Sequence, residues 1–341
     1  MAQESPAKVK VTGIKQVALV VKDAKKTAEA YWNILGIGPW ELREWGSPSV
    51  LYDRTYHGKP MWAKEILAHA YLGDLEVELC QPVEGDSLYR DWLEERGEGL
   101  HHLKFLCDDV DEVAEVLTGQ GYPSLQSGHF GDPKTKAGGF NYFDIKPLHV
   151  IWEPVHKPKS LPIEPFARVP ETAQESPAKV KVTGIKQVAL VVKDAKKTAE
   201  AYWNILGIGP WELREWGSPS VLYDRTYHGK PMWAKEILAH AYLGDLEVEL
   251  CQPVEGDSLY RDWLEERGEG LHHLKFLCDD VDEVAEVLTG QGYPSLQSGH
   301  FGDPKTKAGG FNYFDIKPLH VIWEPVHKPK SLPIEPFARV P

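Results

Sequence analysis

The stretch "LHHLKFLCDDVDEVAEVLTGQGY", residues 100–122, decides the fold because an apolar run is followed directly by helical spacing. The apolar run predicts a β-strand, and the acidic turn and the spaced apolar residues after it predict an amphipathic helix. The stretch "GIKQVALVVKDAKKTAEAYWNILGI", residues 13–37, has the same plan, with Asp23 matching Asp109 and Ala28 matching Ala114. The sequence therefore contains one strand–helix unit twice, at an offset of 86 residues.

A hairpin follows each of these units. The segment "KEILAHAYLGDLEVELCQP", residues 64–82, turns at Gly73-Asp74, which is a strong two-residue hairpin signal. The segment "GGFNYFDIKPLHVIWEP", residues 138–154, turns near Lys146-Pro147. Each half thus reads as β-α-β-β-β, and we expect an α+β fold in which two such modules, about 12–84 and 98–156, form an open concave sheet around a cavity.

The whole chain is itself a repeat, because residues 2–170 recur letter for letter as residues 173–341. Identity over 169 positions indicates an engineered tandem fusion or a very recent duplication. We expect two identical domains, residues 1–170 and 173–341, joined by Glu171 and Thr172 and pairing as a single-chain dimer. The Pro-rich tail "KPKSLPIEPFARVP" and the following "ETAQESPAK" are interpreted as an extended linker.

Charge and hydropathy exclude several classes of protein. The net charge of −13 leaves −6 for each copy once Glu171 is set aside, which argues against a nucleic-acid partner. No apolar run approaches the roughly 18 residues of a membrane span, and the N-terminus lacks the apolar core of a signal peptide. We therefore expect a soluble cytoplasmic protein with reduced cysteines, of which Cys80 and Cys107 read as plain core residues.

Four polar residues on strands are the candidate metal ligands. The alternation of side chains along a strand places Gln16 and His102, which are partners in the half-repeat, on the cavity face. Glu78 and Glu153 lie among apolar residues in the last strand of each half, where an unpaired carboxylate costs several kcal/mol. One imidazole, two carboxylates and one amide oxygen suit Zn, Ni, Co, Fe(II) or Mn. A solvated glutamine at a strand start is the alternative for Gln16.

The adjacent His101 and the nearby Lys104 need separate interpretations. Alternation places Leu100, His102 and Lys104 on one face, and His101 on the opposite face toward the helices. Lys104 could pair with Glu153 or Glu78, hold a substrate anion, replace the charge of the metal, or extend to solvent.

Two further residues are candidates for proton transfer. Counting back from the Gly73-Asp74 turn sets His69 opposite Glu78, and Glu65 then shares the cavity face. His69 could act as a proton shuttle, a fifth ligand or a substrate contact, or could only hydrogen-bond to Glu78. The segment of residues 38–62 adds a dense group of aromatic residues, which predicts either an aromatic-lined pocket or packing in a core or dimer interface. These residues are Trp40, Trp45, Tyr52, Tyr56 and Trp62.

Over about residues 12–156 of each copy, the sequence resembles the vicinal oxygen chelate superfamily. The phrase "VELCQPVEGDSLYRDWLEERGEGLHHLKFLCDDVDEV" is similar to methylmalonyl-CoA epimerases, in which the paired modules hold one metal. Gln16 stands where that family has a histidine, so the Gln/Glu/His/Glu set resembles the ligands of zinc glyoxalase I instead. The resemblance to the epimerases also implies a catalytic carboxylate near Glu65.

The favoured function is a metal-dependent isomerase, epimerase or lyase that moves a proton α to a carbonyl through a stabilised enolate. Glu153, Glu65 or His69 would move the proton, on a small-molecule substrate that is anionic or aromatic. The alternatives are an Fe(II) ring-cleaving dioxygenase and a non-catalytic protein that binds an aromatic ligand. The second copy repeats every candidate; these are Gln187, Glu249, His273 and Glu324 for the metal, and Glu236, His240, Lys275 and Glu324 for catalysis.

Overall fold

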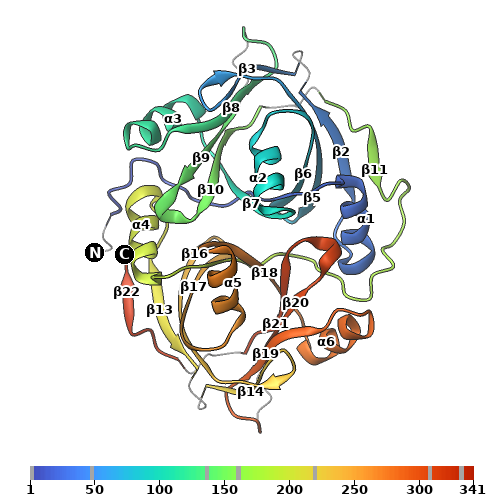
Figure 1. Ribbon diagram of the computed structural model, residues 1–341, viewed down its shortest axis with the longest axis vertical. Helices are drawn as coiled ribbons and strands as arrows, with labels where there is room; N and C mark the ends of the chain where they lie inside the picture. Colours follow the sequence, from blue (N-terminus) through green and yellow to red (C-terminus); the bar gives the residue numbers. More distant parts are fainter. Residues whose placement is uncertain are drawn as a thin grey trace.

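A computed structural model describes residues 4–46, 50–134, 138–158, 163–217, 221–305, 309–329 and 334–341. The two copies lie end to end along the long axis of the molecule, and each builds one eleven-stranded sheet (Figure 1). The first copy contains β1 (Gln16–Val20), α1 (Ala24–Leu35), β2 (Trp40–Trp45), β3 (Leu51–Tyr56), β4 (Lys59–Pro60), β5 (Ala63–Leu72), β6 (Leu75–Gly85), α2 (Leu88–Arg96), β7 (Gly99–Leu106), α3 (Val110–Gly119), β8 (Ser124–Phe130), β9 (Gly139–Ile145), a 3-10 turn (Lys146–Leu148), β10 (Val150–His156) and β11 (Ala167–Val169).

The second copy repeats this order. Its elements are β12 (Gln187–Val191), α4 (Ala195–Leu206), β13 (Trp211–Trp216), β14 (Leu222–Tyr227), β15 (Lys230–Pro231), β16 (Ala234–Leu243), β17 (Leu246–Gly256), α5 (Leu259–Arg267), β18 (Gly270–Leu277), α6 (Val281–Gly290), β19 (Ser295–Phe301), β20 (Gly310–Asp315), a 3-10 turn (Lys317–Leu319), β21 (Ile322–His327) and β22 (Ala338–Val340).

The α+β fold of paired βαβββ modules is confirmed. The strand order β2-β5-β6-β1-β7-β10-β9-β8 places the first strand of each module side by side at the centre of the sheet. Asp23 begins α1 by accepting a hydrogen bond from the backbone of Lys26, and Gly36 ends it in the left-handed conformation. The predicted hairpin forms at Gly73-Asp74, so His69 is paired with Glu78.

Three elements depart from the simple module plan. Strand β3 comes after β2 in the chain, but it pairs with β8 near the opposite edge of the sheet. The β3–β4 hairpin therefore brings the two sides of the sheet together. Helix α2 connects the modules and begins at Ser87, whose side chain accepts from the backbone of Arg90. Strand β11 pairs with β2, so this part of the predicted linker belongs to the sheet, because the edge of β2 offers unpaired backbone groups to it. Residues 171–179 form no helix or strand.

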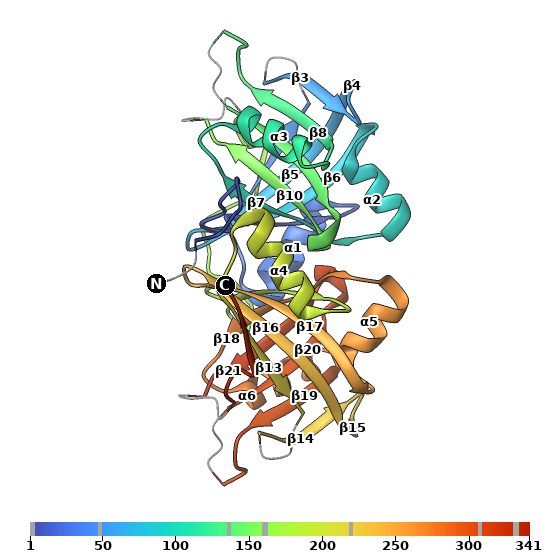
Figure 2. The same cartoon turned by 90° about the vertical axis from the view of Figure 1, so that its left-hand side faces the viewer.

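The copies also exchange their N-terminal arms. The backbone N–H of Val182 donates to the carbonyl of Leu35 in α1, and Val11 makes the same bond to Leu206 in α4. Helices α1 and α4 pack at the boundary between the copies (Figure 2). The Tyr31 hydroxyl donates to the carbonyl of Leu319 at 2.9 Å. The two copies therefore share one apolar core. Among the described residues, no helix is both long and apolar enough to cross a membrane.

Candidate metal and substrate site

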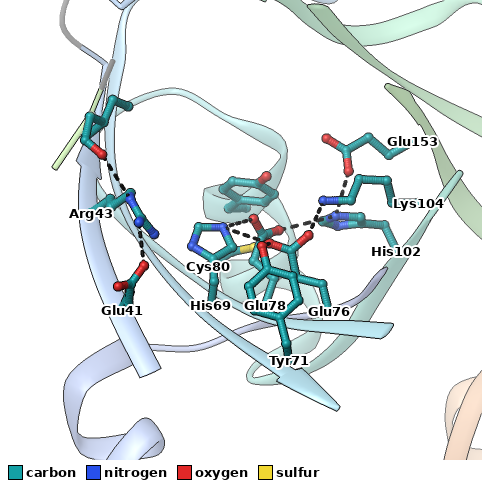
Figure 3. Close-up of polar contacts among 12 residues, drawn as sticks. Glu41, Arg43, His69, Tyr71, Glu76, Glu78, Cys80, His102, Lys104 and Glu153 are labelled. Atoms are coloured by element: carbon teal, nitrogen blue, oxygen red, sulfur yellow. Dashed lines mark hydrogen bonds and ion pairs between the residues drawn. The ribbon is translucent and has the colours of Figure 1, made fainter. Parts of the chain in front are cut away.

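A cavity lies on the concave side of each sheet. Its volume is about 430 Å³ in the first copy and about 170 Å³ in the second. The larger value is in the range of small-molecule sites. Strands β5, β6, β7 and β10 supply Glu65, Glu76, Glu78, Lys104 and Glu153 to its lining, and Figure 3 shows side chains from these strands converging from opposite sides.

His102 lies between the two predicted carboxylates. Its Nε2 atom is 3.5 Å from Oε2 of Glu78 and 3.4 Å from Oε2 of Glu153. His102 is fully buried, and its Nε2 atom and Oε2 of Glu153 lack a hydrogen-bond partner among the described residues. Burial lowers the pKa of His102, but Glu153 and Glu78 outweigh that effect and raise the pKa above its usual value.

Gln16 is buried nearby, on the neighbouring strand β1. In the sheet it is aligned with Glu76 and Lys104, whereas Ala18 is aligned with Glu78 and His102. Both polar atoms of the Gln16 side chain are buried, with no hydrogen-bond partner among the described residues. The alternative that Gln16 is solvated is therefore wrong, because the start of β1 is buried.

Glu78 is held by residues other than His102. Its Oε1 atom accepts from Nε2 of His69 at 2.9 Å, and its Oε2 atom accepts from the Cys80 thiol at 3.2 Å. Burial raises the pKa of Glu78, but the interactions with His102 and His69 bring it well below its ordinary range. Cys80 is buried in the core, as predicted, and its thiol is in addition a polar contact of the site. As the side chains stand, no three His, Cys, Asp or Glu residues in the described ranges form a metal cluster.

Lys104 forms an ion pair with a residue that is not among the partners predicted from the sequence. Its Nζ atom donates to Oε2 of Glu76 at 2.7 Å, and the Tyr71 hydroxyl donates to the other oxygen of Glu76 at 3.1 Å. The predicted direct pairing with Glu153 or Glu78 is wrong, because the register brings Glu76 and Lys104 to either side of Gln16. Burial lowers the pKa of Lys104, but Glu76 outweighs it and raises the pKa. The spacing of Glu76 and Glu78, two residues apart on one strand, was the signal for this partner.

The predicted placement of His101 and Leu100 is also wrong. A β-bulge pairs Ala18 with His102 and then Leu19 with Leu100, so His101 is the extra residue. Leu100 consequently joins the core on the helix side. His101 lies against Trp92 of α2, and its Nδ1 atom is 2.8 Å from Nδ1 of His102.

Glu65 lines the cavity as predicted, but it is tied to Arg54. The Nη2 atom of Arg54 donates to both Glu65 oxygens, at 2.8 and 3.1 Å, and Nη1 donates to the carbonyl of Ala63. Burial raises the pKa of Glu65, and Arg54 opposes the rise. This pair connects β3 to β5 and closes the sheet over the cavity. His69 also lines the cavity, and its Nδ1 atom is buried with no partner among the described residues.

Of the two alternatives for the aromatic group, the pocket holds for Trp45 and core packing holds for Trp40. Trp45 lines the cavity, whereas Trp40 packs in the helix-side core and Trp62 is 49% exposed. Tyr52 stacks on His129, and the Tyr56 hydroxyl donates to Asp91. The other aromatic side chains of the lining come from β5, α2, β8 and β9; they are Tyr71, Tyr89, Phe130, Phe140 and Tyr142.

The second copy repeats the arrangement. Nε2 of His273 lies 3.6 Å from Glu249 and 3.4 Å from Glu324. Gln187 lines the cavity, and both of its side-chain polar atoms lack partners in the described part of the chain. The remaining contacts recur as Lys275 with Glu247, Arg225 with Glu236, and His240 with Glu249.

Comparison with known families agrees with this arrangement. Residues 15–141 and 186–312 match the model of the Glyoxalase/Bleomycin resistance protein/Dioxygenase superfamily. The chain belongs to this superfamily. The match includes Gln16, Glu78 and His102 and ends before Glu153. Superfamily membership confirms the relationship inferred from the sequence, including its presence in two tandem copies.

Three individual proteins similar to this chain each share less than 30% sequence identity with it. The chain is 27% identical over 107 residues to the uncharacterized protein YqjC of Bacillus subtilis (strain 168), a match that covers 31% of this chain and 66% of that protein. A triple mutant of 4-hydroxymandelate synthase from Streptomyces coelicolor has the same fold, with a TM-score of 0.54, 16% identity and 94% of each chain covered. A Mn(II)-bound glyoxalase from Novosphingobium aromaticivorans aligns with a TM-score of 0.47, 14% identity, and coverage of 95% of this chain and 84% of that one.

Proposed function

We propose that each cavity binds a divalent cation and transfers a proton α to a carbonyl group, as an isomerase, epimerase or lyase. His102, Glu78, Glu153 and Gln16 would hold the cation in the first copy, and Zn, Ni, Co, Fe or Mn suit this donor set. The observation that carries the proposal is the group of buried polar atoms on Gln16, His102 and Glu153 that have no partner within the described part of the chain. Such atoms are costly unless something pairs with them.

The spacing of the donors supports this proposal. Donor atoms bound to one cation at about 2.1 Å in a tetrahedral arrangement are about 3.4 Å apart. The observed separations between His102 and the two carboxylates are 3.4 and 3.5 Å. Hydrogen bonds between the same atoms would be about 2.8 Å long. Glu78 would give up its bond to the Cys80 thiol on binding.

The residues around this set can move a proton on either side of a bound substrate. A bound cation would stabilise the negative charge that develops on a carbonyl oxygen when the α-proton leaves. Because Nε2 of His69 donates to Glu78, the Nδ1 lone pair of His69 is free to accept a proton. The Glu153 carboxylate, on the opposite side of the Glu78–His102 pair (Figure 3), would be the second acceptor through Oε1, while its Oε2 atom, 3.4 Å from Nε2 of His102, would hold the cation. Two bases on opposite sides suit an isomerase or epimerase, which removes a proton with one and returns it with the other.

Metal analysis and isotope exchange test the proposal together. The purified protein should contain cation and should exchange the α-hydrogen of a thioester or a 2-oxoaldehyde with deuterated solvent. The double variant His102→Ala/Glu78→Ala, made in both copies, should lose both properties, whereas Glu84→Gln, an exposed change on the same strand β6, should keep them. Full cation content in the double variant would refute the site, and no exchange across both substrate panels would refute the reaction.

A binding protein without catalysis is the second candidate. The half of the cavity around Trp45, Phe130 and Phe140 is aromatic, and no metal cluster is already formed among the described residues. This function predicts tight binding of an aromatic ligand with no cation and no turnover. A ring-cleaving dioxygenase has less support because Gln16 stands where that reaction would require a second histidine.

A further inference from the structure

We propose that His101 is a positioning residue that fixes a proton on Nδ1 of His102 and thereby directs the Nε2 lone pair of His102 at Glu78 and Glu153. This inference rests on the proposed function, because it concerns how His102 would bind a cation. Nothing in the superfamily match assigns a part to His101.

The two histidine rings are held in one arrangement. The Nδ1 atoms of His101 and His102 are 2.8 Å apart, and the rings are perpendicular, at 87°. The same contact recurs at 2.8 Å in the second copy. The β-bulge makes the contact possible, because strict alternation would place consecutive side chains on opposite faces. Trp92 packs perpendicular to His101 and Tyr89 stacks on His102, so neither ring is free to turn.

Counting donors and acceptors then assigns the protons. A bond between two Nδ1 atoms requires that one carry hydrogen and the other a lone pair. A neutral imidazole carries hydrogen on only one nitrogen, so His102 can offer the Nε2 lone pair only if its hydrogen is on Nδ1. His101 must therefore accept at Nδ1 and carry its own hydrogen on Nε2. Metal-binding histidines are commonly oriented in this way by a hydrogen bond to the second ring nitrogen.

The environment of His101 argues against a purely structural role. His101 is 1% exposed, and its Nε2 atom has no hydrogen-bond partner among the described residues. An imidazole buried with a single polar contact destabilises the fold relative to an apolar side chain of similar size. Within the described ranges, its one polar contact is with His102, which lies between the two carboxylates.

A matched pair of substitutions tests the acceptor. His101→Asn keeps an acceptor near the Nδ1 position, whereas His101→Leu has similar size and none. Either change is made in the first copy only, so the unchanged His272–His273 pair serves as a reference within the same molecule. Metal-free protein is titrated with Zn²⁺ by calorimetry, and thermal unfolding is recorded for each variant.

The unmodified chain should show two equal Zn²⁺ sites. His101→Leu should leave one site unchanged and weaken the other about 10- to 100-fold, and His101→Asn should recover most of that loss. Two equal sites in the Leu variant, or equal weakening by Leu and Asn, would overturn this inference alone. Absence of Zn²⁺ binding by the unmodified chain would overturn the proposed function and the inference together. Nitrogen NMR gives an independent readout without cation: a protonated Nδ1 on His101 overturns the inference, and an unprotonated one supports it.

Discussion

Replacing Arg54 by methionine should destabilise the protein by leaving Glu65 buried without a charge partner. The two side chains are 6% and 3% exposed, and the contact is made through both Glu65 oxygens. Removing one partner of a buried ion pair lowers the free energy of unfolding by about 3–5 kcal/mol. When Arg54 and Arg225 are both replaced, we expect this loss in each copy. The double replacement Arg54→Met/Glu65→Leu removes the isolated charge. The double variant should therefore lose only about 1–3 kcal/mol of unfolding free energy, because the carbonyl of Ala63 still lacks its donor.

The loss should also depend on pH. Burial raises the pKa of Glu65 and Arg54 opposes that rise, so the single variant has a still higher pKa at Glu65 in the folded state. Between that value and the ordinary value, the folded chain binds a proton that the unfolded chain does not. The single variant should therefore regain stability as the pH falls from 8 toward 5, by at most about 1.4 kcal/mol per pH unit and per copy.

Urea unfolding followed by tryptophan fluorescence at pH 8 and pH 5 measures both effects. The double variant should not show the gain at low pH. A loss below about 1 kcal/mol in the single variant, or equal losses in the single and double variants, would refute the interpretation of Arg54 and Glu65 as a buried ion pair. Loss of isotope exchange in a folded double variant would show that Glu65 takes part in catalysis.

Three further changes have simple physical consequences. Gly85→Ala places a methyl group 2.4 Å from a backbone carbonyl at φ +79°, whereas Gly73→Ala, at φ +64°, meets nothing within 4 Å. Thermal unfolding should show a loss of at least about 3 kcal/mol for the first and about 1 kcal/mol for the second, and equal losses would contradict the clash. Burial raises the pKa of Cys107 to about 12. Its alkylation by iodoacetamide should accelerate about tenfold per pH unit from pH 7 to 10, and a plateau near pH 9 would be inconsistent with that pKa. Replacing Tyr31 and Tyr202 by phenylalanine leaves two buried carbonyls of the opposite copies unpaired, and should cost about 1–3 kcal/mol each in urea unfolding; an unchanged midpoint would contradict it.

The sequence predicted those features that depend on local pattern. The strand–helix units follow from their periodicity, and the pairing of His69 with Glu78 follows from the two-residue turn at Gly73-Asp74. The same alternation predicted that Gln16, Glu78 and His102 share one face of the sheet. These features need only short-range rules, which is why they could be predicted.

The features that were missed depend on distant parts of the chain. The prediction from alternating side chains failed at His101 because a β-bulge forms where β7 pairs with β1. Nothing in the sequence around His101 indicates this bulge. The partner of Lys104 depends on the parallel register of β1 and β6, which brings Glu76 beside Gln16. The ordered tail at β11 depends on an open edge of β2 that only the assembled sheet provides.

The most direct test of the central claim is the number of cations bound by one chain. The claim is that His102 and its counterpart each complete one site, so the unmodified protein, saturated with Zn²⁺ and desalted, should carry two cations per chain by native mass spectrometry. His102→Ala in the first copy alone should reduce that number to one. Two cations in this variant, or none in the unmodified protein, would contradict the account.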